Sequence, residues 1–132
     1  MAHPLWPLFD LRIRSVRLEL RLPTDDELVT LAALAGAGIH DAAEMPFSVP
    51  WSTKESPRFE REFAQYHWGA RASWRPSDWT LDLMAVHGDR PIGMQGIFAR
   101  EFATFRTVKT GSWLARDHQG RGLGKEMRAA VL

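Results

Sequence analysis

Apolar residues at every second position predict the first strand, and a change to helical spacing predicts the helix after it. In Arg17–Leu22, three leucines alternate with charged residues, so one face of this strand is expected to be buried and the other to meet water. Thr24-Asp-Asp-Glu27 has the residue types of a capping box, which predicts that a helix begins there. This helix is expected to end at Gly36 and Gly38 and to bury a stripe formed by Leu28, Leu31, Ala32 and Ala35.

A second helix is predicted after Ser56-Pro57, because this pair can supply an N-cap and a first-turn proline. It is expected to end before Pro76, with His67 beside an apolar stripe that consists of Phe59, Phe63, Tyr66 and Ala70.

The period returns to two at Trp79, where Trp79–Val86 predicts a strand with alternating faces. His87–Pro91 has the composition of a hairpin turn, and Ile92–Phe98 is the expected partner strand. After a connection over Glu101–Thr107, Val108–Ala115 completes a run of three strands that we expect to be antiparallel. The predicted order is therefore a strand, two helices and three strands, followed by one more helix.

Composition narrows the function classes. The 132 residues suit one domain, and a hydrophobic share of 45% with a charged share of 25% is ordinary for a globular protein. The net charge of +1 gives no argument for a nucleic-acid or membrane partner, and Leu5–Phe9 is too short and too proline-interrupted for a signal or membrane segment. A cysteine count of zero excludes disulfides and thiolate chemistry within this chain and suits the cytoplasm. The five histidines lack the i, i+4 spacing of a helical metal site, so no metal is expected.

The glycine-rich turn Gln119–Lys125 carries the strongest chemical signal. It follows a predicted strand and opens a helix with an apolar stripe, an order that brings backbone N–H groups and the positive end of a helix dipole to an anion such as pyrophosphate. A Walker-type phosphate loop is excluded because Gln119 stands where its first glycine belongs and Glu126 stands where its hydroxyl belongs. The dinucleotide fingerprint G-x-G-x-x-G is excluded because Lys125 stands at its third glycine.

The pattern that fits is Gln/Arg-x-x-Gly-x-Gly/Ala, here Gln119-Gly-Arg-Gly-Leu-Gly124, and it resembles the acyl-coenzyme A loop of the Gcn5-related N-acetyltransferase (GNAT) superfamily. Trp6–Ile13, Met45–Trp51 and Glu126–Leu132 are similar to actinobacterial members of the ribosomal-protein-alanine acetyltransferase-like branch, some of which use succinyl-CoA. The resemblance implies an α/β (α+β) fold, with a mixed, mainly antiparallel sheet flanked by helices. It also implies an N-acyltransferase that moves an acetyl or succinyl group from coenzyme A to an amine.

The resemblance also implies the residues that bind the cofactor. Gln119 would brace the turn, Arg121 and Lys125 would add positive charge, and main-chain groups of the preceding strand would pair with pantetheine. The expected contacts are Trp113, Leu114, Ala115, Gln119, Gly120, Arg121, Gly122, Leu123, Gly124 and Lys125. The competing interpretation is a glycine-rich turn that holds no ligand.

The sequence says less about which residues would bind the acceptor amine. Phe47 and Trp51 lie in a proline-containing loop, where they either plug the helix layer or wall the acceptor pocket. Many relatives place a Glu where this chain has Thr110, so that base does not transfer and the catalytic residues are unknown. Gln95 and Ser112 are the expected acceptor contacts, and the remaining polar candidates are Asp82 and Glu101. The acceptor itself could be a protein N-terminus, a lysine or a small amine.

The family's domain continues beyond the helix that follows the coenzyme loop. Residues 1–132 are therefore expected to form one GNAT domain truncated after that helix begins, completed by self-association or by a complementing C-terminal segment. On this hypothesis the chain alone is inactive. The alternatives are a coenzyme A-binding fragment without turnover and a remnant that only assembles.

Overall fold

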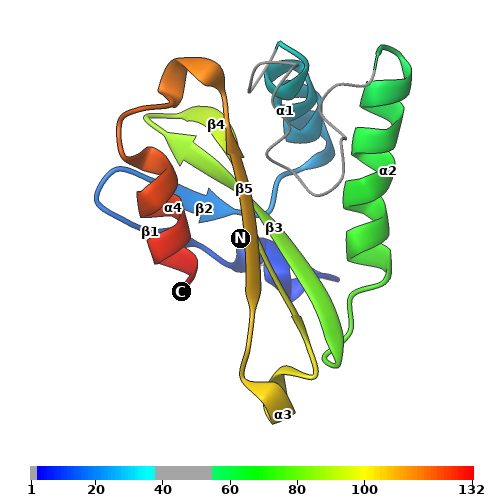
Figure 1. Ribbon diagram of the computed structural model, residues 1–132. Helices are drawn as coiled ribbons and strands as arrows, with labels where there is room; N and C mark the ends of the chain where they lie inside the picture. Colours follow the sequence, from blue (N-terminus) through cyan, green and yellow to red (C-terminus); the bar gives the residue numbers. More distant parts are fainter. Residues whose placement is uncertain (1–2, 38–54) are drawn as a thin grey trace.

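The computed structural model, which describes residues 3–37 and 55–132, contains one antiparallel sheet in the order β1-β2-β3-β4-β5 (Figure 1). The strands that the sequence predicted are β2 (Glu19–Arg21), β3 (Asp78–His87), β4 (Arg90–Arg100) and β5 (Lys109–Leu114), and a short β1 (Ile13–Arg14) precedes them. Each neighbouring pair is antiparallel. The predicted α/β (α+β) fold class is confirmed.

Helices cover the two faces of this sheet unequally. Helices α1 (Asp25–Gly36) and α2 (Arg58–Ala72) lie on one side, and α4 (Leu123–Val131) lies on the other (Figure 1). We call these sides the α1/α2 face and the α4 face. The short elements are η1 (Pro7–Asp10), α3 (Phe102–Phe105) between β4 and β5, and η2 (Arg116–His118) after β5.

The capping box predicted at Thr24 is present. The amide of Glu27 donates to the Thr24 hydroxyl over 3.2 Å, and the Thr24 amide donates to the Glu27 carboxylate over 3.0 Å. These bonds satisfy two N–H groups that a helix start leaves without an intrahelical partner. The predicted stripe of α1 is also confirmed, because Leu28, Leu31, Ala32 and Ala35 are all buried.

The start and the stripe of α2 differ from the prediction. Pro57 is the N-cap residue rather than a first-turn residue, and the Ser56 hydroxyl bonds the Glu60 carboxylate instead of capping the backbone. Tyr66 is 55% exposed, whereas His67 is 7% exposed and packs its ring 4.7 Å from the ring of Phe63. Positions three and four residues after Phe63 lie on the same side of a helix, so spacing alone did not separate them. Burial lowers the pKa of His67 to about 4, which leaves it neutral at pH 7.

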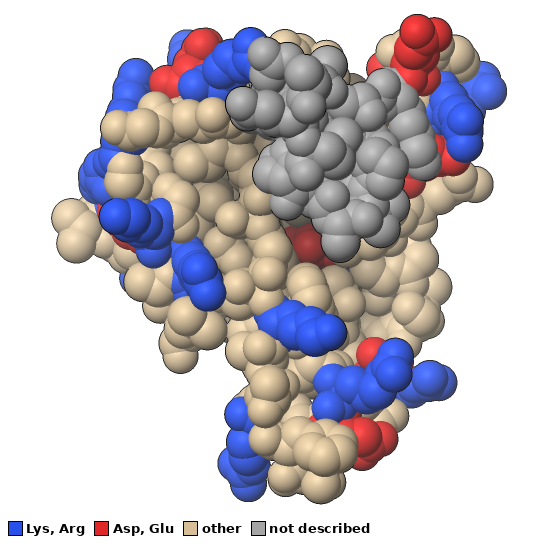
Figure 2. All heavy atoms as spheres, viewed as in Figure 1, with Lys and Arg blue, Asp and Glu red and all other residues tan. Residues whose placement is uncertain are grey.

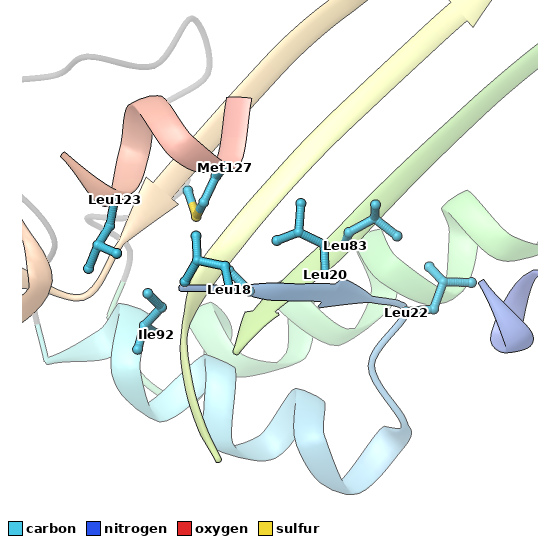
Figure 3. Close-up of a cluster of buried hydrophobic side chains, with 8 residues drawn as sticks. Leu18, Leu20, Leu22, Leu83, Ile92, Leu123 and Met127 are labelled. Atoms are coloured by element: carbon cyan, nitrogen blue, oxygen red, sulfur yellow. The ribbon is translucent and has the colours of Figure 1, made fainter. Parts of the chain in front are cut away.

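A β-bulge between β3 and β4 adapts the sheet to α4. Ala85 is opposite Gly93 and Val86 is opposite Pro91, so Ile92 is the extra residue. Ile92 is fully buried in the cluster on the α4 face. Figure 3 shows Leu123 and Met127 of α4 lying over the sheet in this cluster, whose other members are Leu18, Leu20, Leu22, Leu83, Ala85 and Ile92.

A polar latch fixes the start of α4 to the hairpin between β1 and β2. The Glu126 carboxylate accepts from the Ser15 hydroxyl, from the Arg17 amide over 2.8 Å and from Arg17 Nε over 2.7 Å. Arg17 Nη1 in turn donates to the Arg121 carbonyl over 3.0 Å. The bonds from Ser15 and Arg17 lower the pKa of Glu126 to about 2, so this carboxylate stays ionised in mild acid.

Met127→Ala is expected to lower the free energy of unfolding by about 2–4 kcal/mol, because the side chain is fully buried and its removal leaves a cavity under α4. Urea unfolding measures the change. Arg128→Ala, at an exposed position of the same helix, should stay within about 0.5 kcal/mol of the original chain. Equal losses in the two variants would contradict the proposed anchoring of α4.

Glu126→Ala is expected to speed amide hydrogen exchange at position 126 and at Met127 by roughly tenfold, because the latch that holds the first turn of α4 is lost. Exchange followed by NMR at pH 6 measures the effect, with Arg128→Ala as the matched control. Unchanged rates at position 126 and at Met127 would show that the latch does not stabilise this turn.

Candidate functional site

The turn between η2 and α4 has the backbone that the glycine pattern predicted. Gly120 has φ 78° and Gly122 has φ 77°, a left-handed conformation that side-chain-bearing residues adopt at a cost. Gly122 is also the N-cap residue of α4. Gly124 lies within the helix, so no left-handed conformation requires a glycine there.

The first turn of α4 presents backbone donors. Its first intrahelical bond runs from the Glu126 amide to the Gly122 carbonyl over 3.1 Å, so the N–H groups of Leu123, Gly124 and Lys125 precede the hydrogen-bonded part of the helix. The dipole of the nine-residue helix adds partial positive charge at the same place. This geometry suits a phosphate or pyrophosphate.

Charge on the surface supports the same chemistry. Arg121 and Lys125 are exposed beside the turn, and Figure 2 shows Lys and Arg gathered on the side of the molecule where α4 lies in Figure 1. The surface over β5, between α4 and the α1/α2 pair, is mostly uncharged in this view. An anionic head group and a longer uncharged tail would therefore meet matching surfaces.

The turn is tied to the end of β5. Gln119 Nε2 donates to the Leu114 carbonyl over 2.9 Å, which is the bracing contact that the sequence predicted. The backbone of the short η2 helix closes the same corner, because the His118 amide donates to the Ala115 carbonyl over 2.9 Å. The glycine turn is thus held at a fixed position relative to the strand.

Among the described strands, β5 is the edge of the sheet next to the turn. The Ala115 amide donates to the Ile92 carbonyl over 2.7 Å, and in an antiparallel ladder the direction of these groups alternates along the strand. The main-chain N–H and C=O groups of Trp113 and Ala115 therefore point toward β4. Those of Ser112 and Leu114 point toward the edge that no described strand covers. Of the three residues predicted to offer main-chain contacts, Leu114 thus has its main-chain groups at the free edge, and Trp113 and Ala115 have theirs paired toward β4.

The two predicted acceptor contacts, Gln95 and Ser112, lie opposite each other on β4 and β5. Gln95 is fully buried, and its amide donates to the carbonyls of Gly96 over 3.0 Å and Gly111 over 3.3 Å. Its Oε1 is buried without a hydrogen-bond partner in the part of the chain that the structure describes. The other two predicted contacts, Phe47 and Trp51, lie outside the described residues.

The remaining polar candidates are spread over the fold. Glu101 is exposed next to α3, at the opposite end of β5 from the turn (Figure 1), so it is too far away to act there. The His118 ring lies 6.2 Å from that of His87, and its Nδ1 is buried without a partner within residues 3–37 and 55–132. In the same ranges, His, Asp and Glu side chains form no group of three that could hold a metal.

Asp82 is a partly buried carboxylate on the α1/α2 face. It stands opposite Gly96 on β4, and its Oδ1 lies 2.6 Å from the point where a side chain at Gly96 would begin. Burial raises the pKa of Asp82 to about 6, against an opposing hydrogen-bond contribution from Tyr66. Its Oδ2 is buried and has no hydrogen-bond partner among the described residues.

The structure adds contacts that sequence reasoning missed. The roles of Ser15 and Arg17 depend on a pairing more than 100 positions away in the sequence, and no local pattern signals it. The pair Gly96 and Gly111 was visible as two glycines inside predicted strands, which often mark a close approach of a ligand or backbone.

Every helix in the described part of the chain is too short or too polar to cross a bilayer.

Comparison with known proteins identifies the family. The family model of the acetyltransferase (GNAT) domain matches residues 17–132. Similar solved structures include RimL, a ribosomal-protein alpha-N-acetyltransferase in complex with coenzyme A, at a TM-score of 0.70 and 18% identity over 92% of this chain.

Two further structures show the same fold. A Vibrio cholerae protein described as a ribosomal-protein-serine acetyltransferase matches at a TM-score of 0.66 and 24% identity over 93% of this chain. Mycobacterium smegmatis RimJ, solved with a coenzyme A disulfide, matches at a TM-score of 0.67 and 17% identity over 86% of this chain. The chain spans 65%, 65% and 54% of the lengths of these three structures. Since the family model covers most of the sequence, the chain belongs to the GNAT acetyltransferase domain family.

Proposed function

We propose that this chain binds acyl-coenzyme A at the turn from Gln119 to Lys125 and along the edge of β5, as part of an N-acyltransferase. One observation carries the proposal. Two glycines in the left-handed conformation lead directly into the first turn of α4, whose N–H groups precede its hydrogen-bonded part, and they follow the edge strand β5. Coenzyme A has the same order of parts, with a pyrophosphate followed by an uncharged pantetheine arm that contains amides. RimL and RimJ were solved with coenzyme A or its disulfide.

In this proposal each part of the site has one task. The N–H groups of Leu123, Gly124 and Lys125 bind the pyrophosphate, and Arg121 and Lys125 add charge at its solvent side. The outward main-chain groups of Ser112 and Leu114 pair with the pantetheine amides as an added strand would. The thioester then lies at the β5 edge, where the neutral form of an acceptor amine attacks its carbonyl carbon. A C–N bond forms, the C–S bond breaks, and the nitrogen loses a proton while coenzyme A leaves as the thiolate and takes up a proton to become the thiol.

The identity of the transferred group and of the acceptor belongs to the same proposal. An acetyl or a succinyl group is the proposed cargo, and a protein N-terminus, a lysine or a small amine is the proposed acceptor. We also propose that residues 1–132 form one such domain and that it acts in the cytoplasm, completed by a second copy or by a complementing C-terminal segment. Coenzyme A binding without turnover is the alternative.

Gly122→Glu is expected to abolish coenzyme A binding, because the new side chain strains a left-handed residue and places a negative charge at the pyrophosphate site. Lys125→Glu, which leaves the glycines intact, should weaken binding by about tenfold through loss of one charge-assisted contact. Titration calorimetry with coenzyme A measures both.

Gly69→Glu is the matched control, because Gly69 lies on α2 and a side chain there would meet open space. It should bind coenzyme A as the original chain does. Binding that survives both Gly122→Glu and Lys125→Glu would remove the site from the proposal. Thiol release from acetyl-CoA and succinyl-CoA with a panel of amines then separates an enzyme from a binding module.

A further inference from the structure

The hairpin between β4 and β5, which carries α3, has a surface that the coenzyme site does not use. It lies at the end of β5 opposite the glycine turn and projects beyond the sheet, away from α1, α2 and α4 (Figure 1). Its exposed side chains are aromatic or positively charged. We call this surface the α3 tip, and it consists of Arg100, Phe102, Phe105, Arg106 and Lys109.

The α3 tip exposes two phenyl rings. Phe105 is 66% exposed and Phe102 is 36% exposed. Because they are three positions apart in one helical turn, their rings lie on the same side of α3. Contact of these rings with water is unfavourable, so a partner that buried them would gain free energy.

Hydrogen bonds hold the backbone of this hairpin in one conformation. The Glu101 amide donates to the Ser77 carbonyl over 2.7 Å, and the Arg106 amide donates to the Phe102 carbonyl over 2.8 Å. The Thr104 amide donates to the Glu101 carbonyl over 3.0 Å. The rings are therefore presented on a preformed backbone, which a partner does not have to order on binding.

The two residues that flank α3 are in the left-handed conformation. Glu101 has φ 51° and Arg106 has φ 53°, and residues with a side chain adopt this conformation at a cost. All four residues of α3 are exposed, so the strained backbone does not serve to fill the core. Strain of this kind is concentrated at functional positions, which favours a binding role for the α3 tip.

The α3 tip is positively charged. Residues 100–109 contain three cations, Arg100, Arg106 and Lys109, and one carboxylate, that of Glu101, so positive charges exceed negative ones by two. Arg100 lies 3.7 Å from Asp78 with 81% of its side chain exposed, and such an exposed pair contributes little.

Charge and aromatic surface lie together. The Arg106 guanidinium carbon is 6.0 Å from the centre of the Phe102 ring, which is the distance of a cation–π contact. The adjacent turn adds Arg75 and Asp78, whose charges cancel. Figure 2 shows charged atoms around an uncharged area at the end of the molecule where α3 lies in Figure 1.

The composition of the α3 tip distinguishes between classes of macromolecule. Nucleic acids are held by Lys and Arg contacts to several phosphates, and this surface has an excess of only two positive charges. A segment that lies in a membrane surface needs a long apolar face, and α3 has four residues. A small surface that combines phenylalanine with arginine is typical of the centre of a protein–protein interface.

We propose that the α3 tip binds an acidic segment of a partner protein, which buries the ring of Phe105. Arg106 and Lys109 pair with carboxylates of that segment around the ring. This inference goes beyond the proposed function and does not depend on it, because the glycine turn lies at the other end of β5. Coenzyme A and the acidic segment therefore bind independently.

The test is an NMR titration of the full chain at pH 7 and low salt with a synthetic peptide of repeated Glu-Leu-Glu-Ala units. The backbone amides of Phe105, Arg106 and Lys109 are expected to shift. A peptide of Lys-Leu-Lys-Ala units, which has the same apolar residues and the opposite charge, should leave them unmoved. Because salt screens exposed charges, sodium chloride at about 0.5 M should raise the dissociation constant of the acidic peptide at least tenfold.

Two variants with matched controls locate the contact. Phe105→Ser removes the exposed ring, and Lys109→Glu reverses one charge; each should raise the dissociation constant of the acidic peptide at least tenfold. Val16→Ser changes an apolar residue that is 98% exposed on the hairpin between β1 and β2. Arg90→Glu reverses an exposed charge in the turn between β3 and β4. Neither control should change the constant.

Several results would overturn the proposal. Peptide-induced shifts could lie elsewhere, or could persist at full strength in Phe105→Ser or Lys109→Glu. Tip amides that shift with protein concentration, without peptide, would assign the surface to a second copy of this chain. Binding of phosphatidylglycerol vesicles or oligouridylate through Phe105, with no response to the acidic peptide, would assign it to a membrane or to RNA.

Discussion

The attachment of α4 to the sheet is the constraint on which the rest of the site depends. A nine-residue helix is too short to be stable by itself, so its position and its order come from tertiary contacts. Leu123 and Met127 bury its inner side over the sheet (Figure 3), and Glu126 joins its first turn to Ser15 and Arg17. Only a helix held in this way presents its free N–H groups at a fixed distance from β5, and a diphosphate needs that fixed distance.

The sheet also separates groups of opposite charge. The turn before α4 places Arg121, Lys125 and the start of a helix dipole beside one face, whereas Asp82 lies on the other face. Between them, β5 forms the edge at which the two sides meet (Figure 1).

The sequence was informative where a feature depends on neighbouring residues. The capping box at Thr24, the alternation of Leu18, Leu20 and Leu22 and the glycine turn are local, and the structure contains each of them. The errors arose where a residue's position depends on distant partners. Spacing allowed either Tyr66 or His67 on the stripe of α2, and packing against Phe63 selected His67.

The site too could be predicted only where it depends on residues that are neighbours in the sequence. The pattern predicted the glycine turn at the start of α4, but the ladder between β4 and β5 decides which main-chain groups face outward. That ladder depends on the bond from the Ala115 amide to the Ile92 carbonyl, and Ile92 is displaced by a bulge that periodicity does not show. Asp82 was one polar candidate among several until pairing placed Gly96 and Gly111 beside it.

The contacts of Glu126 explain why an acidic residue can stand directly after Lys125, the last of the predicted anion contacts. Its pKa is lowered to about 2 by the bonds from Ser15 and Arg17, so it is charged whenever an anion would bind. Arg17 neutralises that charge over 2.7 Å and also holds the Arg121 carbonyl, so both Glu126 oxygens are used at the β1–β2 hairpin. A negative charge in the first turn also interacts favourably with the helix dipole. The same residue therefore stabilises the start of α4 while leaving the positive charges of Arg121 and Lys125 available to a ligand.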